Sequence, residues 1–243
     1  MKENRYDDPV FFAKYSHTPR SERGLEAAGE WEALRAILPE FAGKRVLDLG
    51  CGYGWHCVYA LEHGAAAVTG VDISEKMLAV AREKTTADNA VYLRAAMEDV
   101  DFPAESFDVA LSSLALHYVA SFADMAQKVH RWLKPGGNFV FSMEHPIFTA
   151  YGNQDWYRDA QGNILHFPVD NYFYEGPRQA VFLGEKVVKY HHTLTTILDG
   201  LLAHGFALRR VVEPQPPARM LDMEGMRDEL RRPMMLLVAA QKT

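Results

Sequence analysis

The chain has 243 residues, of which 48% are hydrophobic, and its formal net charge is -6 at pH 7. This length suffices for one sizeable core, and the acidic balance argues against nucleic acid as a direct partner. Two cysteines are too few for a disulfide framework, and no apolar run approaches the roughly 20 residues of a membrane span. We therefore expect a cytoplasmic protein that binds neither nucleic acid nor a membrane.

The first 40 residues predict an arm followed by one helix. Residues 1–20 are polar with interspersed aromatic side chains and show no clean period. Residues 21–38 carry apolar side chains at helical spacing after a serine suited to an N-cap, and Pro39 ends the pattern. We expect residues 1–40 to act as a lid.

Short apolar segments then alternate with helical ones. Such an alternation predicts a parallel sheet with helices on both of its faces. We expect residues 41–145 to form this doubly wound, Rossmann-like core. The predicted strands are residues 45–50, 66–74, 90–96, 106–116 and 138–146, and the predicted helices are residues 55–64, 74–85 and 121–133.

Residues 146–192 interrupt the alternation with many aromatic side chains among Gly, Asn, Asp and Pro. Pieces such as "KVVKYHH" (186–192) alternate, which favours short antiparallel strands. We expect a small aromatic-rich α+β insertion after the fifth strand that covers a substrate. Residues 193–243 should complete the sheet with a helix at 193–204, a strand at 206–213, a helix near 219–231 and a last strand at 234–241.

The stretch "VLDLGCGYGW" (46–55) follows the first predicted strand, at the edge where such sheets bind ligands. Its glycines are spaced Gly50-x-Gly52-x-Gly54, which is neither the dinucleotide fingerprint nor a phosphate-binding P-loop. Asp48 opposes a phosphate but suits an ammonium group, and Asp72, at the end of the second strand, suits ribose hydroxyls. The pattern predicts an adenosine-like ligand with an amino group and no phosphate, which describes S-adenosylmethionine.

Several segments together resemble the class I S-adenosylmethionine-dependent methyltransferases, in their small-molecule branch (methyltransferase type 11, or UbiE-like). The resemblance covers about residues 30–145 and the last helix–strand units. It implies a mostly parallel sheet of seven strands with an antiparallel last strand, and S-adenosylhomocysteine as the product of the cofactor. The matching segments are "VLDLGCGYGW" (46–55), "VTGVDISEKMLAVAR" (68–82), "AMEDVDF" (96–102), "FDVALSSLALHYV" (107–119) and "LKPGGNFVFS" (133–142).

The resemblance also implies which residues bind the cofactor. Family members often carry Asp where Ala96 stands, so the adenine amine should be met by Met97 or Glu98 instead. The implied cofactor-binding residues are Asp48 near the amino group, Gly50, Cys51 and Gly52 at the methionine portion, Asp72 at the ribose, Ile73 and Met77 beside the adenine, Met97 and Glu98 at its edge, and Ser113 and Leu114 near the sulfonium.

The expected reaction is an in-line displacement that moves a methyl group to an O, N or C nucleophile of a small molecule. A general base is needed only if this nucleophile must lose a proton. Glu144 and His145 end the fifth strand and are the candidate catalytic pair, although they could merely tie the insertion to the sheet. The candidate substrate-binding residues are His117, Trp156, Tyr172, Tyr174, Arg178, His191 and His192.

Other functions fit the sequence less well. The glycine spacing argues against an NAD-dependent oxidoreductase, and "SSLALHY" (112–118) lacks the Asn/Asp-Pro-Pro-Tyr type of motif of some macromolecule methyltransferases. No metal is expected, because no acidic ligands lie at recognisable spacing from the histidines. The alternative is a non-catalytic S-adenosylmethionine-binding protein, a sensor or a subunit. We expect a monomer or a homodimer.

Overall fold

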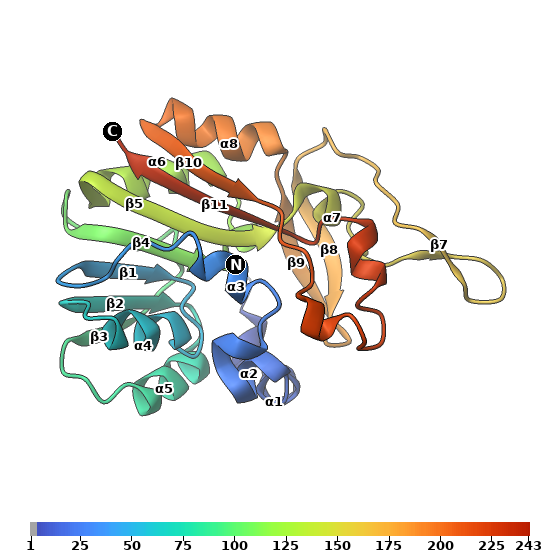
Figure 1. Ribbon diagram of the computed structural model, residues 1–243, viewed down its shortest axis with the longest axis horizontal. Helices are drawn as coiled ribbons and strands as arrows, with labels where there is room; N and C mark the ends of the chain where they lie inside the picture. Colours follow the sequence, from blue (N-terminus) through green and yellow to red (C-terminus); the bar gives the residue numbers. More distant parts are fainter. Residues whose placement is uncertain (1–3) are drawn as a thin grey trace.

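A seven-stranded sheet forms the centre of the computed structural model, which describes residues 4–243 (Figure 1). The strands lie in the order β10-β11-β5-β4-β1-β2-β3. Only β11 runs antiparallel to its neighbours, which confirms the predicted Rossmann-like sheet. Its strands are β1 (Arg45–Leu49), β2 (Ala67–Asp72), β3 (Ala90–Arg94), β4 (Phe107–Ser113), β5 (Leu133–Glu144), β10 (Phe206–Val212) and β11 (Met235–Lys242).

The two faces of the sheet enter separate apolar clusters, because successive residues of a strand point to opposite faces. Leu47 and Leu49 of β1 are buried in the cluster that includes α6 (Phe122–Trp132) and α8 (Leu194–Ala203), whereas Val46 is buried in the other. This second cluster includes α4 (Trp55–Glu62) and α5 (Glu75–Lys84). Helices therefore cover both faces, as predicted. Strand order reverses between β1 and β4, which is where sheets of this kind bind ligands.

The N-terminal segment is folded, but not as one long helix. Its elements are η1 (Arg5–Asp7), α1 (Pro9–Ser16), α2 (Pro19–Arg23), η2 (Gly24–Ala27) and α3 (Trp31–Arg35). The predicted continuous helix over residues 21–38 is wrong, because the chain turns at Gly24, where φ is +70°, a conformation that glycine adopts without steric cost. Phe11 of α1 is fully buried and packs with Ala180 and Val187 of the insertion.

The insertion consists of α7 (Pro146–Ala150) and two antiparallel hairpins. The first hairpin, β6 (Tyr157–Arg158) with β7 (Ile164–His166), projects from the body of the protein, whereas β8 (Gly176–Phe182) and β9 (Glu185–His191) lie beside the end of the sheet (Figure 1). The short antiparallel strands are as predicted.

The predicted helix near residues 219–231 is wrong. Two 3-10 turns stand there, η4 (Ala218–Met220) and η5 (Asp228–Arg231), with Gly225 at φ +78° between them. Within residues 4–243, no helix is long and apolar enough to cross a membrane. Over the same residues, no three His, Cys, Asp or Glu side chains gather as ligands for a metal ion.

Candidate functional site

The loop that follows β1 is held against the end of β2. The backbone N–H of Gly50 donates to the carbonyl oxygen of Val71 at 2.8 Å, and the N–H of Gly52 donates to Asp72 Oδ2 at 2.9 Å. Gly50 has φ +73°, and a Cβ added there would lie 2.3 Å from Cβ of Ala115. Position 50 therefore requires glycine both for its backbone conformation and for its contact with the residues after β4.

Two buried carboxylates flank this loop. Asp72 Oδ1 also accepts the backbone N–H of Ser74 at 2.9 Å, and burial raises the pKa of Asp72 to about 6. Burial raises the pKa of Asp48 further, to about 7, although Cys57 Sγ lies 3.4 Å from its Oδ2. Asp48 Oδ1 is buried without a hydrogen-bond partner in the described part of the chain. Two acidic groups with raised pKa values thus lie behind and beside the glycine loop.

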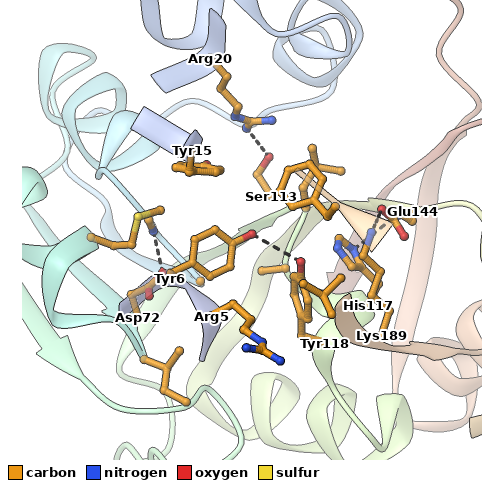
Figure 2. A pocket seen from close by; sticks show the side chains of 18 of the residues that line it. Arg5, Tyr6, Tyr15, Arg20, Asp72, Ser113, His117, Tyr118, Glu144 and Lys189 are labelled. Carbon is orange, nitrogen blue, oxygen red and sulfur yellow. Dashed lines mark hydrogen bonds and ion pairs between the residues drawn. The ribbon is translucent and has the colours of Figure 1, made fainter. Parts of the chain in front are cut away.

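A cavity of about 460 Å³ opens at this edge of the sheet. One end is formed by the glycine loop and the residues that follow β2 and β3, and the other by the ends of β4 and β5, the β8–β9 hairpin and the residues before β11. The N-terminal segment contributes the remaining wall, and Figure 2 shows Tyr6 and Tyr15 reaching in from it. The arm expected from the sequence therefore lines the cavity.

Hydrogen bonds fix η1 over the cavity. Asp7 Oδ1 accepts from Ser74 Oγ at 2.6 Å and from the backbone N–H of Lys76 at 3.2 Å, which joins η1 to the start of α5. The hydroxyl groups of Tyr6 and Tyr118 lie 3.4 Å apart across the cavity (Figure 2). The beginning of the described chain is thus attached on two sides of the site.

Arg20 of α2 attaches the next part of this wall. Its guanidinium pairs with Glu30, whose side chain is only 2% exposed, and its Nη2 donates to Ser113 Oγ at 2.9 Å. Ser113 Oγ in turn lies 3.0 Å from Ser142 Oγ of β5. A buried ion pair therefore links the N-terminal segment to the ends of two central strands.

A polar group lies at the far end of the cavity, where Glu144, Lys189 and His117 line it (Figure 2). Gln154 does not line the cavity but bonds to two of these residues. Lys189 Nζ pairs with Glu144 Oε1 and donates to Gln154 Oε1 at 3.0 Å, and Gln154 Nε2 donates to Glu144 Oε2. The backbone N–H of Glu144 donates to His117 Nδ1 at 3.4 Å. Lys189 thereby connects β9 to the end of β5.

The charges of this group follow from its contacts. Burial is the largest influence on Glu144 and raises its pKa, but His117, Lys189 and Gln154 outweigh burial and hold the pKa below its usual value. Burial lowers the pKa of His117 to about 4. At neutral pH Glu144 is therefore an anion paired with Lys189, and His117 is neutral.

Most of the predicted cofactor-binding residues meet at this cavity. Cys51 instead lines a neighbouring pocket of about 50 Å³, and Asp48 is buried behind the loop without lining either one. Leu114 stands in the left-handed region with φ +52°, which is a strained conformation for leucine. The predicted cofactor-binding residues that line the cavity are Gly50, Gly52, Asp72, Ile73, Met77, Met97, Glu98, Ser113 and Leu114.

The predicted catalytic pair is separated. Glu144 lines the cavity, but His145 does not. The His145 Nδ1 accepts the backbone N–H of Ile147 at 3.1 Å as the N-cap of α7, and its Nε2 lies 2.9 Å from Glu213 Oε1. His145 therefore begins a helix and joins it to the end of β10, and the catalytic role that we expected for it does not fit this position.

Among the predicted substrate-binding residues, His117 lines the cavity and six others do not. Arg178 Nε donates to the carbonyl oxygen of Ala150 at 2.8 Å, and His191 Nδ1 lies 2.8 Å from Thr149 Oγ1, so both hold the insertion together. The six that lie elsewhere are Trp156, Tyr172, Tyr174, Arg178, His191 and His192. Trp156 packs beside Arg232, and Tyr174 is 75% exposed. The hydroxyl of Tyr172 accepts the N–H of Leu194, and His192 Nε2 bonds to the carbonyl oxygen of Val119.

Sequence reasoning expected a lid from residues 1–40 but named none of its residues as part of the site, and it missed Lys189. The alternation of "KVVKYHH" (186–192) carried a usable signal, because a strand with Val187 inward also turns Lys189 inward. The N-terminal segment had no comparable periodicity. The cavity-lining residues that sequence reasoning missed include Arg5, Tyr6, Tyr15, Arg20, Glu30, Tyr118, Phe182, Val187, Lys189, Met234 and Met235.

Comparisons with known proteins agree with this geometry. Residues 47–141 match the family model of a methyltransferase domain. A Listeria monocytogenes protein provisionally assigned as an S-adenosylmethionine-dependent methyltransferase is 55% identical, with a TM-score of 0.87, over 90% of this chain and 99% of that one. An S-adenosylmethionine-dependent methyltransferase from Mesorhizobium loti is 48% identical, with a TM-score of 0.83, over 90% of this chain and 100% of that one. An uncharacterised Haemophilus influenzae protein is 30% identical over 98% of this chain and 96% of its own length. The chain belongs to the S-adenosylmethionine-dependent methyltransferases.

Proposed function

We propose that this methyltransferase acts on a small molecule that binds in the cavity beside the cofactor, and that the methyl group moves by in-line displacement. The observation that carries the proposal is one cavity with two chemically different ends. The glycine loop and Asp72 form one end, and the buried pair of Glu144 and Lys189 lies at the other. The N-terminal segment covers the space between them, which suits a small acceptor more than an extended polymer.

The residues at the glycine-loop end suit S-adenosylmethionine. Each oxygen of the Asp72 carboxylate accepts one backbone hydrogen bond and retains capacity for a ribose hydroxyl. Ile73 and Met77 offer apolar surface to an adenine ring, and the glycines allow close approach of the methionine portion. Asp48 Oδ1, buried without a partner in the described chain, places a compensating charge behind the loop for an ammonium group.

When bound, S-adenosylmethionine supplies a methyl carbon made electrophilic by a positively charged sulfur. The contribution of the protein is to align the acceptor and to exclude water, and alignment alone can lower a barrier by roughly 7–11 kcal/mol in favourable cases. Leu114 has a left-handed backbone conformation that costs about 1–2 kcal/mol. The hydrogen bond from its N–H to the Ser142 carbonyl oxygen, at 2.8 Å, fixes it in this position beside the cavity. Ser113, tied to Arg20, fixes the adjacent wall.

The test is incubation of the purified protein with methyl-labelled S-adenosylmethionine and a fractionated pool of small metabolites. We expect acceptor-dependent formation of S-adenosylhomocysteine and a labelled small-molecule product. Asp72→Ala should abolish the turnover, and Asp88→Ala, which changes an exposed acid after α5, should not. Cofactor binding without turnover in any fraction would contradict the proposal and favour a non-catalytic sensor.

A further inference from the structure

A buried ammonium group faces the end of the cavity formed by the ends of β4 and β5 and the β8–β9 hairpin, which we call the acceptor end because the methyl acceptor would bind there. Its hydrogen bonds to the described residues leave one of its three N–H donors unused. Lys189 is only 3% exposed, and its Nζ donates to Glu144 Oε1 and Gln154 Oε1. An ammonium group has three N–H donors. Among residues 4–243, no hydrogen-bond acceptor contacts the third N–H of Lys189, although the ring of Phe182 is 5.6 Å from Nζ. A buried donor without a partner is costly, so this position favours a ligand that accepts a hydrogen bond.

His117 provides a second donor in the same place. Its Nδ1 accepts the backbone N–H of Glu144, so the proton of the neutral ring is on Nε2. His117 is 4% exposed and lines the cavity, and the part of the chain that the structure describes offers no acceptor to Nε2. Figure 2 shows His117 and Lys189 side by side at one end of the cavity. Two donors held beside the same residue, Glu144, suit the two oxygens of a carboxylate.

Neither Glu144 nor His117 is suited to act as a general base that removes a proton from the methyl acceptor. Both Glu144 oxygens already accept hydrogen bonds, from Lys189 and Gln154, and these contacts keep Glu144 a weak base. The Nε2 atom of His117 carries the ring proton, so it has no free lone pair with which to accept a proton from the methyl acceptor. An alcohol or an ammonium group would need to lose a proton before or during methylation. A carboxylate is already deprotonated at neutral pH and needs no base.

A bound cofactor would make this end of the cavity favourable for an anion. The charged side chains of this end form two pairs, Arg20 with Glu30 and Lys189 with Glu144, so their charges balance. The positively charged sulfur of the cofactor would therefore attract a carboxylate without opposition from a net negative charge.

We propose that the acceptor is a small carboxylic acid with an apolar body, bound as its carboxylate by Lys189 and His117 and converted to a methyl ester. The inference rests on the proposed function. One carboxylate oxygen forms the new bond to the methyl carbon, while the carbon–sulfur bond breaks and leaves its electron pair on sulfur. The products are the ester and S-adenosylhomocysteine, and no proton is transferred. The apolar body would contact Phe182, Val187, Met234 and Met235.

The test measures binding rather than turnover. Protein saturated with S-adenosylhomocysteine is titrated calorimetrically with hexanoate and with benzoate, and in parallel with their uncharged amides. We expect at least one of the two carboxylates to bind about tenfold more tightly than its amide. The informative variant is Lys189→Met combined with Glu144→Gln, because Lys189→Met alone leaves a buried unpaired charge. Lys186→Met, on the exposed side of the same strand, is the matched control.

Each outcome decides one claim. The preference for carboxylate over amide should disappear in the double variant and persist in Lys186→Met, while all three proteins bind S-adenosylhomocysteine alike. If S-adenosylhomocysteine itself does not bind the wild-type protein, the proposed function fails. If it binds but neither carboxylate exceeds its amide, or if the double variant keeps the preference, the carboxylate proposal is overturned and the proposed function stands.

Discussion

Gly50 and Ala115 approach each other so closely that a Cβ on Gly50 would lie 2.3 Å from Cβ of Ala115. The first residue follows β1 and the second lies just after β4, so this contact joins the two strands at which the sheet reverses its order. The glycine loop is therefore defined by packing against its neighbour as well as by its own turn.

Gly50→Ala should be far more damaging than Gly43→Ala. Both glycines have φ near +70°, where alanine is strained by about 1–2 kcal/mol. Only Gly50 meets another atom, since a Cβ at Gly43 has nothing within 4 Å. Overpacking should add about 1–3 kcal/mol at Gly50. Urea denaturation of the two variants measures the difference, and equal losses of stability would contradict the close contact.

Asp48→Asn should stabilise the cofactor-free protein, and increasingly so as the pH rises from about 4 to about 7. Because the pKa of Asp48 is raised from 3.8 to about 7, the folded state binds more protons than the unfolded state in this range. The free energy of unfolding of the wild type therefore falls there. A shift of this size corresponds to on the order of 4 kcal/mol.

The measurement is chemical denaturation of wild type and Asp48→Asn at several pH values. The advantage of the variant should grow up to about pH 7 and stay constant above it. A difference that does not change with pH would show that Asp48 is ionised in the folded protein throughout.

Asp7→Ala should loosen the N-terminal wall of the cavity. The variant loses the acceptor that bonds Ser74 Oγ and the N–H of Lys76. At a partly exposed site these bonds are worth about 1 kcal/mol, so we expect roughly fivefold weaker binding of S-adenosylhomocysteine. Hydrogen exchange of the amides in α1 should also become faster, because the N-terminal segment is less firmly attached in this variant. Asp222→Ala, at a highly exposed acid, is the control, and unchanged exchange in α1 would contradict this attachment.

Arg20→Met should destabilise the protein by about 3–5 kcal/mol, because it leaves Glu30 buried without a counter-charge. Combining it with Glu30→Gln should recover most of the loss. Arg219→Met breaks an exposed pair with Glu32 and should cost less than about 1 kcal/mol. Guanidinium denaturation gives all three values. If the double variant were no more stable than Arg20→Met, the loss would come from the arginine's packing and not from the isolated carboxylate.

The sheet was predictable because its signal is local. Each strand of the core is a short apolar run, and the turn "GCGYG" (50–54) stands where a parallel sheet binds ligands. The place of Asp72 at the end of β2 could be predicted in the same way, and its role as a ribose ligand stays a prediction. The helix predicted over residues 21–38 failed because apolar spacing does not reveal the left-handed turn at Gly24.

The acceptor end was less predictable because contacts distant in sequence build it. Glu144 and His145 are neighbours, yet only Glu144 faces the cavity, since His145 begins α7 and reaches Glu213. Lys189 comes to Glu144 from 45 residues away, through a hairpin whose docking no periodicity encodes. The aromatic residues expected to form a substrate cover instead pack within the insertion or stand exposed, as Tyr174 does.

The most direct test of the account is calorimetric titration of the wild-type protein and of Asp72→Ala with S-adenosylmethionine and S-adenosylhomocysteine. We expect one site per chain, micromolar affinity in the wild type, and binding at least about tenfold weaker in the variant, since charged hydrogen bonds contribute about 1.5–3 kcal/mol. Asp88→Ala should bind as the wild type does. Absence of binding by the wild type, or equal affinity in Asp72→Ala, would contradict the assignment of this cavity to the cofactor.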